Sequence, residues 1–325
     1  MDFQLSEDQK ALRAGIRSFC DGRVPIEVLR ELEKQGGGGA LWNELAEMGV
    51  FSLRQRESAG GVGLGSADAV IVFAELGRSL VPGPLIWTHL AADLVPGAGA
   101  GAVVAGGVEQ LRQSSEPVLV EHLDQLDALL VLRRDGVYRV DPKTLSARSA
   151  GTPLDPFTPI FTVDALPAGE RIADAATGAR LRLEGAALAA AQLFGIAERT
   201  QELATEYAKR RQQFDRAIGS FQAIKHILAD CYTRQEIARA AAYAAGATLD
   251  DPAVGSVARA VATAKVIAGD AAMKNARACI QVHGGMGYTW EVPAHYYLKR
   301  VWVLENAFGD GSEHAEQMAE IIAAD

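Results

Sequence analysis

The chain has 325 residues, of which 49% are hydrophobic and 22% are charged, and its formal net charge at pH 7 is −9. This length allows two or three domains with a large buried core, and the composition is that of an ordinary globular protein. The acidic balance argues against a nucleic-acid partner, which favours a basic surface. No apolar run reaches the ~18 residues that a membrane span requires, so we expect no membrane-spanning segment.

The cysteines and the first residues indicate the compartment. Cys20, Cys231 and Cys279 are far apart in the sequence and odd in number. They fit neither a disulfide framework nor a zinc site, and they suit a reducing compartment, so we expect no metal site. The opening stretch MDFQLSEDQK is acidic and polar, which is not the pattern of a signal peptide. These features favour a cytoplasmic protein.

Residues 1–95 are predicted to form an N-terminal helical domain whose helices are separated by glycine-rich breaks. Ser6, with Gln9 three residues later, has the pattern of a capping box at the start of the first helix. One break, at 36–39, precedes a predicted helix at 40–48. A second break, at 60–65, precedes a predicted helix at 66–80.

A glycine run follows this domain. Gly97-Ala-Gly99-Ala-Gly101 superficially fits the dinucleotide-binding fingerprint, but that fingerprint has meaning only between a strand and a helix. Here Pro96 precedes the run, and the apolar segment after it, Ala102 to Ala105, is short and ends in two glycines. We interpret the run as a linker or turn.

Residues 96–173 are predicted to form a small β domain. Short apolar or alternating runs bounded by Gly, Pro or Asp indicate strands. These runs are Pro117 to Val120, Ala128 to Leu132, Gly136 to Val140 and Ile160 to Val163.

Residues 174–325 are predicted to form a C-terminal four-helix bundle, because four helical patterns follow one another with short connections. The predicted helices lie at 178–210, 219–247, 252–282 and from Pro293 towards 305. The expected fold class is therefore mainly α, with a small central β domain between two helical domains.

An arginine near the end of the first bundle helix suggests an anion site. Leu193, Ile196, Thr200, Leu203 and Tyr207 recur at steps of three and four, as one face of a helix does. Continued, this rhythm places Arg211 and Phe214 on the same buried face. A buried guanidinium needs an anion, and no acidic residue lies one turn away on that face. The anion is therefore expected from elsewhere in the fold, from a ligand or from a partner chain, which is a first indication of a phosphate.

A second stretch supports a ligand. Gln281 ends an alanine-rich helical pattern, and His283-Gly284-Gly285-Met286-Gly287 follows. Glycines there allow positive φ angles and let a ligand approach the bare backbone. The alternative interpretation is a helix C-cap followed by a turn.

Together, YAKRRQQFDRAIGSFQ (207–222) and QVHGGMGYTWEVP (281–293) resemble the C-terminal domain of the acyl-CoA dehydrogenase family. The stretches MDFQLSEDQKALR, LWNELAEMGVFSL, GGVGLG and VFAELGRSLVPGP resemble the family's opening helices, so that the resemblance spans about residues 1–90 and 174–312. It implies the family's α–β–α architecture, FAD as cofactor, and desaturation of an acyl-CoA thioester between Cα and Cβ.

The resemblance also implies roles for individual residues. Arg211 matches an arginine that crosses the dimer interface to hold the pyrophosphate of FAD bound mainly by the neighbouring subunit. The residues that match the rest of the same cofactor half are Gln213, Phe214, Gln222, Gln281, His283, Gly284 and Gly285. The purely structural alternatives are a buried interhelical ion pair for Arg211, core packing for Phe214 and a helix-start hydrogen bond for Gln222.

The sequence departs from the family pattern in several places. Asp215 replaces the usual glycine after the phenylalanine; Asp tolerates the left-handed conformation, but its carboxylate repels a pyrophosphate. Neither a TEPxAGS-like loop nor a WITN-like strand, which hold the flavin ring in the family, occurs between 96 and 173.

The two family positions of the catalytic carboxylate are also changed. Gly309 and Gly185 occupy them here. Glu184 lies one residue, about 100° of helix, from the second position, and Asp310 lies beside the first. Both are weak candidates for the base, because capping or solvated carboxylates are the default interpretation.

Three functions stay open at this point. The chain is a subunit of a heteromeric dehydrogenase, resembling the paired subunits that some actinobacteria use on bulky CoA thioesters such as steroid side chains, or a self-sufficient homo-oligomeric dehydrogenase with a displaced base, or a non-catalytic subunit. The expected assembly is a dimer or an α2β2 tetramer. The resemblance implies an electron-transferring flavoprotein as acceptor. The sequence specifies neither the acyl chain nor the partner.

Overall fold

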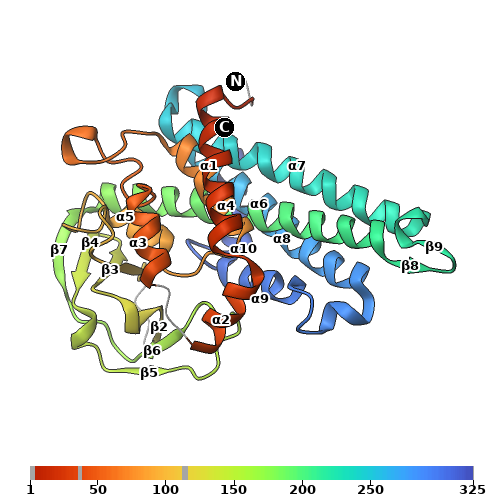
Figure 1. Ribbon diagram of the computed structural model, residues 1–325. Helices are drawn as coiled ribbons and strands as arrows, with labels where there is room; N and C mark the ends of the chain where they lie inside the picture. The colour runs from red at the N-terminus through yellow and green to blue at the C-terminus, as the bar shows by residue number, and fades with distance from the viewer. Residues whose placement is uncertain (1–3, 36–38, 112–115, 325) are drawn as a thin grey trace. The chain divides into compact units, whose positions relative to one another are not determined.

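The protein is described from a computed structural model, in residues 4–35, 39–111 and 116–324, and it is mainly α-helical with a small β region (Figure 1). The predicted fold class is confirmed. The predicted break at 36–39 lies outside the described residues, apart from Gly39. The chain forms two compact units. The helical unit comprises Met1–Val28, Val70–Val81 and Ala186–Asp325, and the sheet unit comprises Leu29–Ala69 and Pro82–Gly185. The three-domain division at 95/96 and 173/174 stays a prediction.

Helix α1 (Glu7–Arg23) opens the helical unit with the predicted capping box. The Ser6 hydroxyl accepts from the Gln9 backbone N–H, and the Gln9 side chain accepts from the Ser6 backbone N–H, each at 3.2 Å. Both otherwise unsatisfied donors at the helix start are thus paired.

The C-terminal helices are α6 (Ala175–Arg210), α7 (Gln222–Asp250), α8 (Val257–His283), α9 (Ala294–Leu304) and α10 (Gly311–Ala324). The first four match the predicted bundle helices with shifted ends, and α10 was not predicted. Helices α6, α7 and α8 run side by side in the helical unit (Figure 1). The buried Asn275 of α8 joins them by donating to Ala197 O of α6 at 3.1 Å and to Cys231 O of α7 at 2.9 Å.

The helical unit also holds a network of buried charges. Arg17 of α1 binds both carboxylate oxygens of Glu75, at 2.8 and 2.7 Å, and lies 2.9 Å from Glu198 of α6. Glu75 belongs to α4 (Ser66–Arg78), whose Arg78 binds Glu202 at 2.6 Å. Because each charge has a partner of opposite sign, the network is compatible with burial.

The remaining helices are α2 (Ile26–Gln35), α3 (Gly39–Glu47) and α5 (Leu85–Ala91), together with the 3-10 turns η1 (Glu57–Ala59), η2 (Leu123–Gln125), η3 (Pro142–Thr144) and η5 (Pro252–Val254). Predicted helices at 40–48 and 66–80 correspond to α3 and α4. Helix α5 was not predicted as a separate element.

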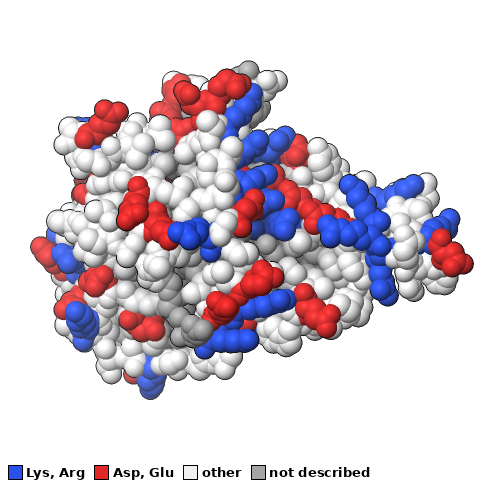
Figure 2. Space-filling model, in the orientation of Figure 1, with Lys and Arg blue, Asp and Glu red and all other residues white. Residues whose placement is uncertain are grey.

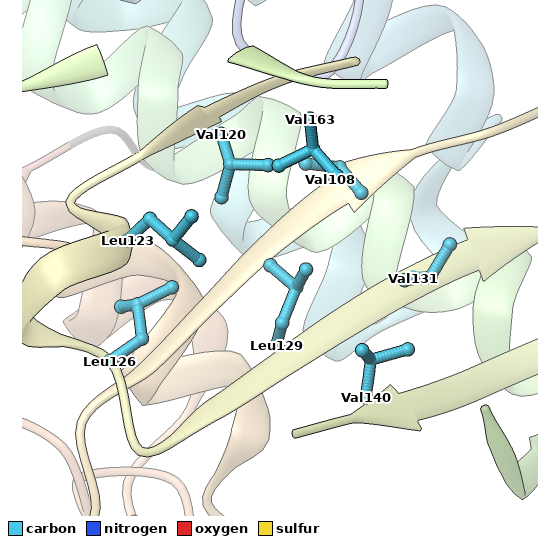
Figure 3. Packing of buried hydrophobic residues seen from close by; sticks show 8 residues of the cluster. All are labelled: Val108, Val120, Leu123, Leu126, Leu129, Val131, Val140 and Val163. Carbon is cyan, nitrogen blue, oxygen red and sulfur yellow. The ribbon is translucent and has the colours of Figure 1, made fainter. Parts of the chain in front are cut away.

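The sheet unit contains two small sheets. One has the order β1-β3-β4-β7, and the other has the order β2-β6-β5. Their bounds are β1 (Ala105–Glu109), β2 (Val118–Glu121), β3 (Ala128–Arg133), β4 (Gly136–Val140), β5 (Ala147–Ser149), β6 (Ile160–Val163) and β7 (Glu170–Asp174). Strands β1 and β3 are parallel, and the other pairs are antiparallel. Apolar side chains of both sheets, including Val120, Val163 and Leu129, form one buried cluster (Figure 3).

Strand β1 corrects the sequence analysis, which ended the apolar run at Gly106-Gly107. Both glycines are strand residues. A Cβ atom at Gly107 would collide with the indole of Trp87 in α5, and one at Gly106 would collide with Leu126. The glycines are therefore required by close packing, although glycine is unfavourable in a strand. Strands β5 and β7 were missed as well.

The glycine run at 97–101 forms hydrogen-bonded turns between α5 and β1, in agreement with the predicted turn. A Cβ atom at Gly101 would lie 2.5 Å from the Ala46 Cβ, so this glycine permits close packing against α3. Across the described residues, no helix is long and apolar enough to cross a membrane. In the same residues, no group of three or more His, Cys, Asp or Glu side chains is placed to hold a metal ion.

Candidate functional site

The first predicted motif lies where α6 ends. The helix stops at Arg210, and the chain turns through a short hairpin of β8 (Gln212–Gln213) and β9 (Arg216–Ala217), then η4 (Ile218–Ser220), into α7. The prediction that Arg211 and Phe214 lie on a buried helix face is wrong. Arg211 is exposed, and Phe214 is 85% exposed. Helix α6 ends at Arg210, so the helical steps of three and four do not continue to Arg211 and Phe214.

The hairpin turn has an unusual backbone. Phe214 and Asp215 both have positive φ angles, 54° and 61°, as the two central residues of a tight I′-type hairpin turn require. Asp tolerates this conformation, as predicted, whereas for an aromatic residue it is uncommon. Phe221 steadies the turn. It makes an edge-to-face contact with Phe214 at 6.1 Å, and the Arg216 guanidinium lies 4.0 Å from its ring centroid.

The surface around this hairpin is basic. Figure 2 shows Lys and Arg side chains gathered at the hairpin end of the helical unit. The exposed cations of this stretch are Lys209, Arg210, Arg211 and Arg216. Arg210 has an exposed ion-pair partner, Glu206, at 3.6 Å. Within the described residues, the Arg211 side chain has no ion pair or hydrogen bond, so the predicted structural alternative for it, a buried interhelical ion pair, does not hold.

The second motif lies at the end of α8. His283 is its last residue, Gly284 caps it with φ 59°, and the 3-10 turn η6 (Gly284–Tyr288) follows. A Cβ atom at Gly287 would come within 2.5 Å of Ile280 O, so this glycine is required by packing. At Gly284 and Gly285 an added Cβ would meet nothing within 4 Å. Their backbone is open to a ligand.

A ring contact joins the two motifs. The rings of Tyr207, in the last turn of α6, and His283 stack with centroids 4.2 Å apart and planes at 28°. Beneath them lies a buried apolar cluster built from Ala204, Ala208, Cys279, Val282 and Ala294. Tyr207 belongs to the predicted apolar seam, whereas its contact with His283 was not predicted, because nothing local in the sequence indicates it.

We call the resulting surface the platform. It consists of Arg211, Gln213, Phe214, Gln222, Gln281, His283, Gly284 and Gly285. All are exposed except His283. Gln222 is the first residue of α7, and Gln213 donates only to its neighbour, Gln212 O. The side chains of Gln222 and Gln281 make no hydrogen bond within the described part of the chain.

Both carboxylates considered as a catalytic base already have partners in this chain. Glu184 is 5% exposed, and its Oε1 lies 2.8 Å from Arg54 and 3.4 Å from Arg180 within the sheet unit. Asp310 caps α10, because its Oδ1 accepts from the backbone N–H groups of Ser312 and Glu313 at 2.8 Å. A role for either as base stays a prediction.

Comparison with known proteins supports the resemblance. The acyl-CoA dehydrogenase C-terminal domain matches residues 177–324, and the N-terminal domain of the same family matches residues 6–115. The acyl-CoA dehydrogenase IpdE2 of Mycobacterium tuberculosis is 34% identical over 90% of this chain and 91% of its own length. The chain belongs to the acyl-CoA dehydrogenase family.

Other relatives of this acyl-CoA dehydrogenase family member differ in length and assembly. The acyl-CoA dehydrogenase FadE34 of M. tuberculosis is 30% identical over 99% of this chain, which spans only 48% of FadE34. The fold matches one chain in the crystal structure of the ChsE4–ChsE5 complex of M. tuberculosis, with a TM-score of 0.87 and 24% identity, and the match covers 99% of this chain and 99% of that chain. The predicted family, enzyme class and cofactor FAD are confirmed.

The platform fits the adenosine diphosphate half of FAD. A guanidinium and two amide side chains suit phosphate oxygens and hydroxyls, and the bare backbone at Gly284 and Gly285 admits a bulky ligand. The neighbouring cations Lys209, Arg210 and Arg216 have the charge that two phosphates require. The roles of the individual residues follow from this fit and from the family pattern, and they are proposals.

Proposed function

We propose that this acyl-CoA dehydrogenase is a subunit that shares its FAD site with a partner chain. Its platform binds the adenosine diphosphate half of FAD, and the partner holds most of the cofactor. One observation carries this proposal. Arg211, Gln222 and Gln281 are exposed and make no side-chain hydrogen bond within the described residues, and they belong to motifs joined by the Tyr207–His283 stack.

The charge and hydrogen-bonding groups of each platform residue indicate which part of FAD it binds. A planar guanidinium binds two phosphate oxygens at once, which an ammonium group does not, so Arg211 takes the pyrophosphate. Gln213 and Gln281 donate to remaining oxygens, and Gln222 lies at the adenosine end. Phe214 presents its ring towards the partner, because its own chain leaves the ring 85% exposed.

The reaction needs a base as well as an acceptor. When bound, FAD accepts the hydride from Cβ of the acyl chain. A carboxylate aimed at Cα must remove the proton from that carbon. In this chain glycines occupy both family positions for that carboxylate, Glu184 is held by arginines, and Asp310 caps a helix. These facts support a base supplied by the partner.

The relatives support a heteromeric enzyme. Two similar solved structures are complexes of unlike chains, ChsE4–ChsE5 and the steroid acyl-CoA dehydrogenase Tcur3481–Tcur3483, the second with TM-score 0.84 and 24% identity. We therefore propose a dimer or α2β2 tetramer acting on a bulky CoA thioester such as a steroid fragment. We also propose a cytoplasmic location and an electron-transferring flavoprotein as acceptor.

Flavin content decides among the three functions. The chain is purified alone and after co-expression with the product of its genomic neighbour, and visible flavin absorption is measured. We expect flavin only in the co-expressed sample. Flavin bound stoichiometrically by the chain alone would establish the self-sufficient enzyme, and colourless protein in both samples would establish the non-catalytic subunit.

Arg211→Ala tests the platform within the complex. We expect flavin affinity to fall about 10- to 100-fold, because a charge-assisted hydrogen bond contributes roughly 1.5–3 kcal/mol. Thermal stability of the flavin-free protein stays unchanged, since the side chain is exposed. Arg148→Ala is the matched control; this arginine is 70% exposed and pairs with Asp164 in the sheet unit. Equal flavin affinity of the two variants contradicts the proposal.

A further inference from the structure

His283 differs from the rest of the platform because it is buried. Its side chain is 7% exposed, at the last position of α8 directly before Gly284. One ring face is covered by Tyr207, with ring centroids 4.2 Å apart. The ring is buried, but its Nε2 is not among the buried side-chain nitrogens that lack a hydrogen-bond partner, so Nε2 is accessible to a ligand or to water.

The hydrogen bond at Nδ1 fixes the tautomer. Nδ1 lies 2.7 Å from the backbone carbonyl oxygen of Cys279. A carbonyl oxygen only accepts, so Nδ1 carries the proton and donates it. The Cys279 sulfur is also close, at 3.7 Å from Nδ1, but it does not change this assignment, because Nδ1 is already the donor to the oxygen.

The second nitrogen is therefore an acceptor. Burial lowers the pKa of His283 below its ordinary value, with the Cys279 carbonyl acting in the opposite direction, so the ring is neutral near pH 7. Nε2 then carries a lone pair. Within the described residues it has no hydrogen-bond partner. A phosphate oxygen, which also only accepts, cannot satisfy it.

We propose that Nε2 of His283 accepts a hydrogen bond from a sugar hydroxyl of the flavin nucleotide. This inference rests on the proposed function and adds a chemical division to the platform. Arg211 binds the phosphates, and His283 accepts a hydrogen bond from a hydroxyl beside the bare backbone of Gly284 and Gly285. A neutral, tautomer-locked imidazole is suited to that task, because it presents a lone pair without a charge.

The ring-stacking and acceptor roles of His283 are separable by substitution. His283→Phe keeps an aromatic ring against Tyr207 and removes the acceptor. His283→Gln loses the ring but places an amide oxygen near the position of Nε2. A purely structural role for the histidine predicts that Phe is tolerated and Gln is harmful, whereas an acceptor role predicts the opposite order for flavin binding.

The experiment uses the complex with its partner subunit, stripped of flavin, and titrates it with FAD by flavin fluorescence. We expect His283→Phe to bind FAD about 10-fold more weakly, as loss of one hydrogen bond of about 1.4 kcal/mol implies, and His283→Gln to recover most of that loss. Melting temperatures of both flavin-free variants show whether each is folded. If Gln alone fails to fold, the Phe result decides.

Two further readouts separate the possible failures. If His283→Phe binds FAD as the unchanged protein does while Arg211→Ala binds it weakly, this inference fails and the proposed function stands. If both variants bind FAD normally, the shared-site proposal fails as well. Subunit association without flavin is measured by analytical ultracentrifugation. Weakened association in His283→Phe assigns the donor to the partner chain and overturns the inference.

Discussion

The platform and the sheet unit treat their polar side chains in opposite ways. In the sheet unit the polar groups bind one another or the backbone: Arg133 donates to Pro167 O at 2.8 Å, Asp155 accepts from Thr158 at 2.8 Å, and Glu184 lies between arginines. At the platform, Arg211 and Gln281 have no such partner within the described residues. An exposed guanidinium and amides without such partners, next to bare backbone, support the proposal that this surface binds a molecule that the single chain does not contain.

The contrast extends to backbone strain. The hairpin places an aromatic residue, Phe214, at φ 54° and leaves its ring in solvent. In the sheet unit, glycine at 106 and 107 relieves crowding under Trp87 and Leu126. Strain is tolerated in a structure where it serves a contact. The Phe214 ring contacts Phe221 of its own chain, and the proposed shared site would give it a second contact in the partner, whereas glycines 106 and 107 serve contacts inside the sheet unit.

The largest effect is expected where the sheet unit satisfies its own charges. Arg54→Met removes the nearer partner of the Glu184 carboxylate, which is 5% exposed, and leaves the half-exposed Arg180 as its ion-pair partner among residues 4–35, 39–111 and 116–324. Removing one partner of a buried ion pair costs roughly 3–5 kcal/mol, and we expect the lower end, since Arg180 remains. Chemical denaturation measures it. Arg148→Met, at an exposed pair, should cost less than about 1 kcal/mol. Equal costs would show that Glu184 is solvated.

An effect of similar size concerns pH. Burial lowers the pKa of His89, which donates from Nδ1 to Val50 O at 3.0 Å, to about 4 from 6.5. The unfolded chain therefore binds a proton more readily than the folded one, and stability falls as pH decreases from about 6.5 to about 4. The loss approaches roughly 3 kcal/mol at 1.36 kcal/mol per unit.

His89→Asn tests that assignment. Asparagine keeps a donor near the Nδ1 position but does not titrate. We expect the variant to lose part of its stability at neutral pH and to show a flatter dependence between pH 6.5 and 4. Flavin affinity should not change, because His89 belongs to the sheet unit. An unchanged acid slope in urea denaturation would assign the slope to other groups.

Sequence reasoning succeeded where the signal is local. The capping box at Ser6 and the strands at Gly136–Val140 and Ile160–Val163 agree with the structure residue for residue, because caps and alternation are read within a few positions. Strand β1 was not predicted because glycine is unfavourable in strands. The packing that requires glycine at 107 involves Trp87, about twenty residues earlier in the sequence. Local propensity gives no warning of such a contact.

The candidate site shows the same limit. The two motifs that contain the platform residues were sufficient to indicate the family. The phosphate was inferred from a buried Arg211, which the structure does not show, so the phosphate site stays a prediction. The exposure of Arg211 was not predictable, because a periodic pattern gives angular position but not the residue at which a helix ends. The end is set by the hairpin and its packing on Phe221. Likewise, the stacking of Tyr207 on His283 depends on how α6 and α8 meet.

The smallest effect is expected for Asp215→Gly, and it bears directly on the platform. Asp215 has φ 61°, where glycine is at no disadvantage, so the change should alter stability by less than about 1 kcal/mol. Flavin affinity of the complex should rise a few-fold, because a carboxylate within reach of a bound pyrophosphate repels it.

Asp215→Asn separates the effect of charge from that of the backbone, since asparagine keeps the shape of the side chain and the tolerance of positive φ. If Asn and Gly strengthen FAD binding equally and high salt removes the difference from Asp, the effect is electrostatic. If Gly alone strengthens binding, the gain comes from a relaxed turn, and Asp215 does not face the phosphates.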